Sequence, residues 1–136
     1  MGIQSKWAKF ESETVFNFSI LPEKIQKYGK EMVFRPKQFI VSRGEALKYI
    51  YFLKSGSAMG TRNYTDGNEY NYFVIDQENG NIGILELFAR ETEYIASIMC
   101  TTEVIAIRMD AEIIYDFVME NTDMLHRCIT LIAQGL

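Results

Sequence analysis

Histidine and cysteine are scarce in this sequence of 136 residues, which contains one histidine and two cysteines. The single histidine, His126, cannot supply the cluster of several ligands that a catalytic metal requires. Cys128 lies two residues away, a spacing that on a helix points the two side chains apart and disfavours a nucleophile–base pair. We therefore predict no catalytic residue, no metal site and no cofactor, and we do not expect an enzyme.

Long hydrophobic runs are also missing. No stretch approaches the roughly 20 apolar residues of a membrane-spanning helix, and the N-terminus lacks the apolar segment of a secretory signal. Cys100 and Cys128 lie far apart in the sequence, and we expect both to be free thiols in a reducing compartment. The sequence predicts a cytoplasmic protein that does not contact a membrane.

Positive charge is also in short supply. The sequence has 14 lysines and arginines against 18 aspartates and glutamates, which gives a net charge of −4. Binding to a nucleic-acid backbone needs a positive field, so the chain by itself is a poor partner for DNA. Hydrophobic residues make up 48% and charged residues 24%, which is typical of a globular chain rather than a disordered one. The length fits a single domain over residues 1–136.

Three segments follow one another along the chain. Residues 1–30 include a short predicted helix that begins near Pro22 and ends at Gly29. Residues 31–109 hold short β-like runs separated by turns, and residues 110–136 are helical. Regular short strands between turns favour a mainly β fold with flanking helices, either a sandwich or a jelly roll.

Residue alternation and turn motifs in the β-like runs indicate the faces of the strands and the positions of the turns. Residues 48–56 alternate, with Tyr49, Tyr51 and Leu53 on one face and Ile50 and Phe52 on the other. The motif TDGN at residues 65–68 predicts a hairpin, because Asp-Gly favours a tight turn, and TTE at residues 101–103 predicts a second one. The aromatic residues are expected to form core and cross-strand pairs, with a nucleobase-stacking surface as the alternative that the acidic balance disfavours.

Two helices are predicted in the last segment. Asp110 is a candidate N-cap for the first, and either Asn121 or Thr122 for the second. The first helix has an apolar stripe of Ile113, Ile114, Phe117 and Val118, and the second one of Leu125, Cys128, Ile129 and Ile132. Because an amphipathic helix must bury its stripe, we expect the second stripe to form the seam of a homodimer, with packing against the chain's own β segment as the alternative.

The order of these elements is informative. A Gly-Glu turn in FIVSRGEALKYIYFLKSG is followed by the Asp-Gly hairpin, by NIGILELF, by YIAS and by TTEVIAIRMDAEIIYDFVMEN. From about residue 20 to the C-terminus this resembles the effector domain of the Crp/Fnr family of bacterial transcription regulators. The resemblance implies a double-stranded β-helix jelly roll of the cyclic-nucleotide-binding type, with the C-terminal helix as the dimer helix. It also implies a helix-turn-helix domain, absent from this chain, through which alone DNA would be bound.

The resemblance further implies a ligand pocket that begins at Gly83. In members that bind cyclic nucleotides, the next residue is a Glu that binds the ribose, and an Arg followed by Ser or Thr binds the phosphate. By alignment those positions hold Ile84, Tyr94 and Ile95, while Glu86 stands where a small residue is usual. The predicted ligand-binding residues are Gly83, Ile84, Leu85, Glu86, Tyr94, Ile95 and Ala96.

These replacements disfavour cyclic AMP, because a cyclic phosphate in a partly buried pocket needs a bidentate cation. Arg62, Arg90 or Arg108 could supply a cation from elsewhere. We therefore predict a sensor of an unknown small-molecule effector that acts by shifting the population of states of the final helix. The alternative is a ligand-free interaction and dimerisation scaffold whose own side chains fill the pocket.

Glu86 has two interpretations. It is either a solvated carboxylate at an outer face or turn, paired with Arg90, or a polar anchor in an apolar pocket that suits a neutral or aromatic ligand and is closed by Tyr94. If the stretch around it is extended, a one-residue shift in register would exchange the faces of Ile84, Leu85 and Glu86.

Overall fold

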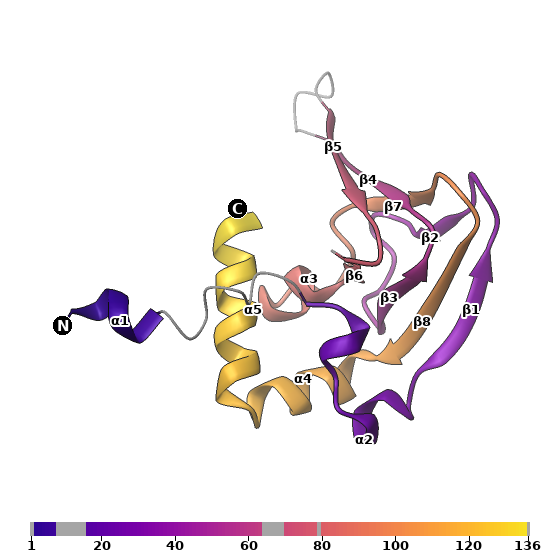
Figure 1. The fold of residues 1–136 in the computed structure, drawn as a ribbon. Helices are drawn as coiled ribbons and strands as arrows, with labels where there is room; N and C mark the ends of the chain where they lie inside the picture. Colours follow the sequence, from indigo (N-terminus) through magenta and orange to yellow (C-terminus); the bar gives the residue numbers. More distant parts are fainter. Residues whose placement is uncertain (1, 8–15, 64–69, 79, 136) are drawn as a thin grey trace.

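Two four-stranded antiparallel sheets enclose the main core (Figure 1). The structure is a computed structural model that describes residues 2–7, 16–63, 70–78 and 80–135. The first sheet has the order β1–β8–β3–β6 and the second β2–β7–β4–β5. The strands are β1 (Lys30–Phe34), β2 (Phe39–Val41), β3 (Tyr49–Ser55), β4 (Ala58–Asn63), β5 (Tyr70–Ile75), β6 (Asn81–Ile82), β7 (Ser97–Cys100) and β8 (Val104–Asp110). This arrangement confirms the predicted jelly roll.

Most of the helices gather at one side of this β-roll (Figure 1). They are α1 (Ile3–Trp7), the 3₁₀ helix η2 (Phe18–Ile20), α2 (Glu23–Gln26), α3 (Ile84–Phe88), α4 (Ala111–Met119) and α5 (Thr122–Gly135). α5 packs against α3 and α4. Within the described part of the chain, no helix has the length and the apolar character needed to cross a membrane.

The two faces of β3 that the sequence predicts lie in two different cores. Tyr51 and Leu53 are buried between the two sheets. Ile50 and Phe52 point to the other side of the same strand and are buried with α4 and α5 in a second core. The strand thus has no solvent-facing side along this stretch, and its two apolar faces hold the β-roll and the helices together.

The second predicted hairpin is wrong. β7 pairs with β2 and β4, whereas β8 pairs with β1 and β3, so residues 101–103 carry the chain from one sheet to the other. A sheet-crossing corner and a hairpin use similar turn residues, and only the partner strands distinguish them. The first predicted hairpin joins β4 and β5, which do pair with each other, but its turn at residues 65–68 lies outside the described residues.

The predicted capping residues begin the last two helices. The Asp110 carboxylate accepts a hydrogen bond from the Glu112 amide at 2.8 Å, and the Asn121 side chain accepts one from the Met124 amide at 3.3 Å. Asn121 rather than Thr122 is therefore the cap of α5. On α4 the predicted stripe is buried or half-buried, as a helix against a sheet requires.

Replacing Val118 with Ala tests the second core. Val118 is fully buried on α4, so the loss of two methyl groups should lower the free energy of unfolding by about 2–3 kcal/mol. Val33 on the edge strand β1 is 62% exposed, and the matched change Val33→Ala should alter it by less than about 0.5 kcal/mol. Urea unfolding measures both, and equal losses in the two variants would contradict this placement of the core.

Candidate functional site

A left-handed glycine directs the chain into the candidate site. Gly83 follows β6 with φ of 107°, and α3 begins at the next residue. A Cβ at this position would lie 2.8 Å from the Ile50 side chain, so glycine suits both the backbone angle and the space. The condition under which a register shift would exchange the faces of this stretch, an extended backbone, is not met. Residues 84–88 form a helical turn, and their faces follow helical rather than strand periodicity.

Glu86 is buried on this turn, with only 8% of its surface exposed. Its Oε2 accepts a hydrogen bond from the backbone amide of Ile95 at 3.4 Å. The interpretation of Glu86 as a solvated carboxylate is therefore wrong. Arg90, by contrast, is exposed at the end of the turn with φ of 61°.

Two adjoining cavities lie along β5 and α3. The smaller, about 90 Å³, is called here the Glu86 cavity, and the larger, about 230 Å³, the α5 cavity. The Glu86 cavity is lined by Phe73, Ile75, Asn81, Ile82, Gly83, Leu85, Glu86, Ile95, Ala96 and Ile98. The α5 cavity is lined by Phe73, Val74, Ile75, Asn81, Ile84, Leu85, Leu131 and Ile132. The walls that they share come from β5, Asn81 and Leu85.

All the predicted ligand-binding residues except Tyr94 line one or both of these cavities. Sequence reasoning missed Phe73, Asn81 and Leu131. Phe73 and Ile75 alternate with Val74 along β5, which is a usable signal for an inward face. Leu131 follows Cys128 by three residues, so it belongs to the inner face of α5.

Tyr94 is buried in a neighbouring cluster of tyrosines. Its hydroxyl donates a hydrogen bond to the backbone oxygen of Tyr49 at 2.5 Å. Burial raises the pKa of Tyr94 above that of an ordinary tyrosine, and the neighbouring Tyr51 adds to this. Tyr94 lines a separate cavity of about 240 Å³ together with Glu45, Ala46, Lys48, Tyr49 and Tyr51. Its hydroxyl is therefore committed to the backbone of β3.

The arginines proposed as substitute cations lie in different places. The Arg108 guanidinium stands 4.2 Å from the centre of the Tyr49 ring, an arrangement that holds its charge at the tyrosine cluster. The side chain of Arg62 lies outside the described residues. Among the described residues that line the Glu86 and α5 cavities, none is lysine, arginine or histidine.

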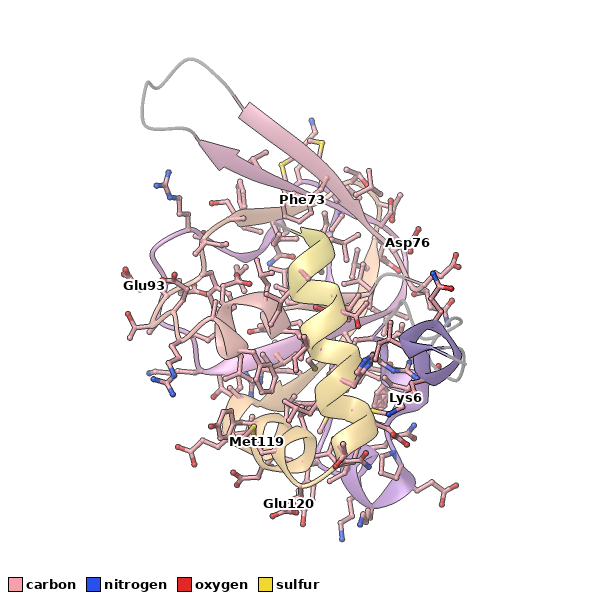
Figure 2. All side chains as sticks on the ribbon, turned by 90° about the vertical axis from the view of Figure 1, so that its left-hand side faces the viewer. Lys6, Phe73, Asp76, Glu93, Met119 and Glu120 are labelled. Atoms are coloured by element: carbon pink, nitrogen blue, oxygen red, sulfur yellow. The ribbon has the colours of Figure 1, made fainter. Side chains whose placement is uncertain are left out.

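The predicted dimer residues lie on different faces of α5. Leu125 and Cys128 pack into the chain's own second core, where burial raises the pKa of the Cys128 thiol to about 12. Ile132 lines the α5 cavity, whereas Ile129 is 57% exposed. Figure 2 shows α5 on the near side of the molecule, with its upper end close to Phe73 of β5. Both cysteines are free thiols, as predicted.

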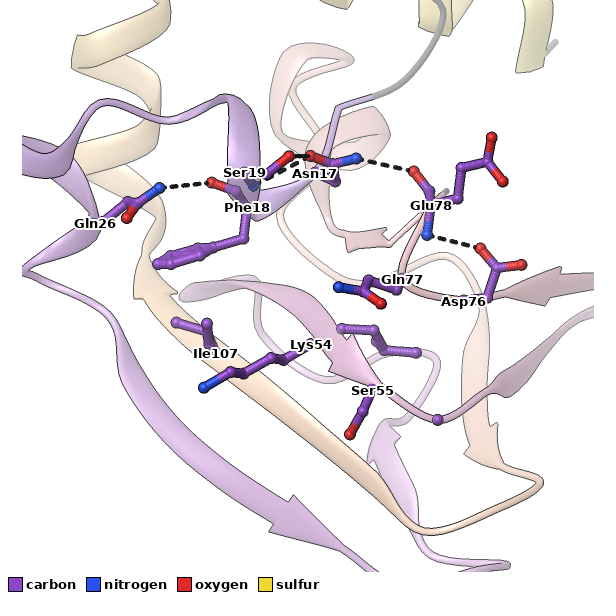
Figure 3. A pocket seen from close by; sticks show the side chains of 12 residues that line it. Asn17, Phe18, Ser19, Gln26, Lys54, Ser55, Asp76, Gln77, Glu78 and Ile107 are labelled. Atoms are coloured by element: carbon purple, nitrogen blue, oxygen red, sulfur yellow. Dashed lines mark hydrogen bonds between the residues drawn. The ribbon is translucent and has the colours of Figure 1, made fainter.

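A wider cleft of about 880 Å³ lies elsewhere, between η2, the end of β3 and the turn after β5 (Figure 3). Its polar groups bond to one another. Asn17 donates to the Glu78 backbone oxygen at 3.3 Å, and the Asp76 carboxylate accepts from the Glu78 amide at 3.0 Å. No predicted site residue lines this cleft. Over the described residues, no three His, Cys, Asp or Glu side chains group as a metal site would need.

Comparison with known proteins identifies the fold. The family model of the cyclic nucleotide-binding domain matches residues 31–121. The chain is similar to the catabolite activator protein of Thermus thermophilus, with a TM-score of 0.68 and 16% identity over 87% of this chain and 56% of that one. It thus spans little more than half of that protein. No curated protein sequence matches the chain.

For two further solved structures, the match covers most of the length of the other chain. The sensor domain of the transcriptional regulator DNR from Pseudomonas aeruginosa has a TM-score of 0.70 and 14% identity, over 98% of this chain and 89% of that one. A transcriptional regulator from Thermotoga maritima has a TM-score of 0.67 and 15% identity, over 83% and 87%. At these identities the likeness establishes a common fold.

Replacing Tyr94 with Phe tests the tyrosine cluster. Loss of the hydrogen bond to Tyr49 should lower the free energy of unfolding by about 1 kcal/mol at neutral pH. Because burial raises the pKa of Tyr94, the folded protein keeps this proton when the unfolded chain loses it, so stability falls as pH rises above about 10. The variant should show a weaker fall in urea unfolding across this range.

The control for this change is Tyr115→Phe. Tyr115 is an exposed tyrosine stacked on Phe88, and its variant should match the wild type at both neutral and alkaline pH. If Tyr94→Phe keeps the full alkaline loss of stability, the assignment of that loss to Tyr94 is refuted.

Proposed function

The chain belongs to the family of cyclic nucleotide-binding domains, and we propose that it is the ligand-sensing domain of a transcription regulator of the Crp/Fnr type. In this proposal the pocket does not bind cyclic AMP in the manner usual for the family, and the effector is a different small molecule. Its fold is shared with the sensor domain of one such regulator. Residues 1–136 form this one sensing unit. In this proposal, a separate helix-turn-helix domain binds the DNA.

The observation that carries the proposal is the chemistry of the cavity walls. Ile84 is buried in the second core where the resemblance places a ribose-binding Glu, and Tyr94 gives its hydroxyl to the Tyr49 backbone where it places an Arg. Glu86 adds a carboxylate to a wall that has no basic residue among those described. Among the described side chains of this wall, a buried phosphate would find no cation and would lie beside a negative charge, which costs several kcal/mol.

The position of the cavities supports a sensing role rather than an inert scaffold. Leu131 and Ile132 of α5 form one wall of the α5 cavity, and Phe73 and Ile75 of β5 form another. A ligand held between these walls contacts the β-roll and α5 at the same time. It favours whichever position of α5 gives the better contacts, and so shifts the population of states that the DNA-binding domain experiences.

The outer face of α5 is proposed as the seam of a homodimer. Ile129 is an isoleucine exposed on an amphipathic helix, and a partner chain that covered it would remove its apolar surface from water. Leu125 and Ile132, which are half-buried, would extend the seam on either side of it. Cys128 would support the seam from beneath, because it packs into the core of its own chain.

Thermal unfolding with a panel of cyclic nucleotides, aromatic acids, amines, thiols and common metabolites tests the sensing role. Cyclic AMP at about 1 mM should leave the melting temperature unchanged, whereas binding with a Kd one hundredfold lower would add about 2.7 kcal/mol. At least one compound that is not a nucleotide should raise the melting temperature. Filling the α5 cavity by Leu131→Phe should remove that rise, while Val33→Phe on β1 should not.

Stabilisation by cyclic AMP would refute the assignment of a different effector and point to a cation outside the described side chains. A panel without effect, together with a loss of stability in Leu131→Phe of about 1–3 kcal/mol, would favour the alternative of a scaffold whose pocket is filled, because a filled pocket has no room for the larger ring. That alternative draws its support from the small volume of the Glu86 cavity.

The dimer seam is tested by Ile129→Arg. Introducing a charge at the centre of an apolar seam should convert a dimer to a monomer in sedimentation equilibrium, with the circular dichroism spectrum unchanged. Val33→Arg places the same charge at an exposed valine on β1 and should leave the mass unchanged. A wild-type monomer, or a dimer that survives Ile129→Arg, would contradict the seam.

A further inference from the structure

We propose that the cavity of about 240 Å³ beside the tyrosine cluster is a second ligand site, which takes a small aromatic carboxylate and binds its negative charge with Arg108. This cavity, called here the tyrosine cavity, is lined by Glu45, Ala46, Lys48, Tyr49, Tyr51 and Tyr94. None of these described lining residues also lines the Glu86 cavity or the α5 cavity. The inference therefore goes beyond the proposed function and does not depend on it.

The first step is the position of Arg108. Strands β1, β8 and β3 are neighbours in one sheet (Figure 1), and Lys30, Arg108 and Tyr51 lie opposite one another on them. Residues directly opposite in antiparallel strands carry their side chains on the same face, so the register places Arg108 beside Tyr51. The guanidinium stands 4.2 Å from the centre of the Tyr49 ring. Arg108 therefore lies beside two walls of the tyrosine cavity.

The second step is the capacity of Arg108 to bind an anion. Stacking on Tyr49 uses the flat face of the guanidinium, whereas its five N–H donors point outward in its plane. Among the described residues, no carboxylate forms an ion pair with Arg108, although the side chain is partly buried. A carboxylate ligand would supply the missing negative charge and accept two parallel hydrogen bonds from the guanidinium.

The third step concerns the other charged groups around the cavity. Two exposed lysines, Lys48 in the wall and Lys30 on β1, add positive charge. The exposed carboxylate of Glu45 also lines the cavity, while that of Asp110 at the end of β8 accepts the first amide hydrogen bond of α4. Water and salt screen exposed charges of both signs, so the partly buried Arg108 sets the preference. One guanidinium balances one negative charge, which is the charge of a carboxylate.

The fourth step is the size and character of the rest of the ligand. An apolar cavity of about 150 Å³ admits benzene, whereas drug-sized ligands occupy about 300–1,000 Å³, so about 240 Å³ suits one ring with a short polar group. The rings of Tyr49, Tyr51 and Tyr94 offer aromatic walls for it. Burial raises the pKa of Tyr51, although Arg108 opposes this rise. The Tyr51 hydroxyl therefore keeps its proton at neutral pH and can donate to the same carboxylate.

The test uses three single-ring probes that differ in charge: benzoate, benzamide and benzylamine. Each is titrated into the wild-type chain up to about 10 mM, near the weakest affinity expected of a ligand of this size. Binding is followed by NMR of the Ala46 methyl group and of the Tyr49 and Tyr51 amides. Benzoate should bind at least about tenfold more tightly than benzamide, as charge-assisted hydrogen bonds imply, and benzylamine should bind most weakly.

Three variants assign the preference to one guanidinium. Arg108→Gln removes the charge, so it should weaken benzoate about tenfold and change benzamide by less than about twofold. Arg108→Lys keeps the charge without the two parallel donors, and it should recover only part of the benzoate affinity. Arg35→Gln makes the first change at an exposed arginine just after β1, and it should leave all three affinities unchanged.

The outcomes separate the inference from the proposed function. Equal binding of benzoate and benzamide, an unchanged benzoate affinity in Arg108→Gln, or no shift of the three signals with benzoate would overturn the inference. The sensing role is judged separately, by the metabolite panel and Leu131→Phe. That variant should leave benzoate binding unchanged, and a loss of benzoate binding there would place the probe in the α5 cavity and overturn the second site. The wild-type ranking tests the inference even if Arg108→Gln fails to fold.

Discussion

The left-handed turn at Gly83 is the constraint on which the rest of the site depends. The chain leaves β6 there with φ of 107° and enters α3 in the space beside Ile50. Only glycine combines that backbone angle with so close a neighbour at little cost. The turn then sends Ile84 into the second core and Glu86 into the cavity wall. The short helix α3, residues Ile84–Phe88, thus contributes both to the packing of the helices and to the wall of the pocket.

The polarity of the pocket follows from the groups that the side chains of this turn, of Tyr94 and of Arg108 already contact. The Tyr94 hydroxyl donates its hydrogen bond to the backbone of β3, and the Arg108 guanidinium lies over the Tyr49 ring. Neither group is then directed to the Glu86 and α5 cavities, whose described walls keep two polar side chains, Glu86 and Asn81. A phosphate in these cavities would therefore meet the Glu86 carboxylate, and it would find no arginine among the described lining residues.

The sequence predicts those features that depend on neighbouring residues. The alternation along β3 and the caps at Asp110 and Asn121 are local patterns, and the structure confirms them. The sheet crossing at residues 101–103 depends on distant partners, so local turn chemistry gives the wrong answer there. Helix α3 is too short to show helical periodicity. The burial of Glu86 then follows from α3 and from Gly83, and this is why local reasoning also allows a solvated carboxylate.

The two faces of α5 make the proposed coupling physically direct. Leu131 and Ile132 line the α5 cavity, while Ile129 is exposed on the same helix. A helix moves as a rigid unit over this short span, because its backbone hydrogen bonds resist local deformation. In the proposed mechanism, a ligand at the inner face and a partner chain at the outer face therefore bias one and the same element. Linkage then requires that a ligand which favours one position of α5 also changes the strength of the dimer, and that the dimer changes ligand affinity by the same factor.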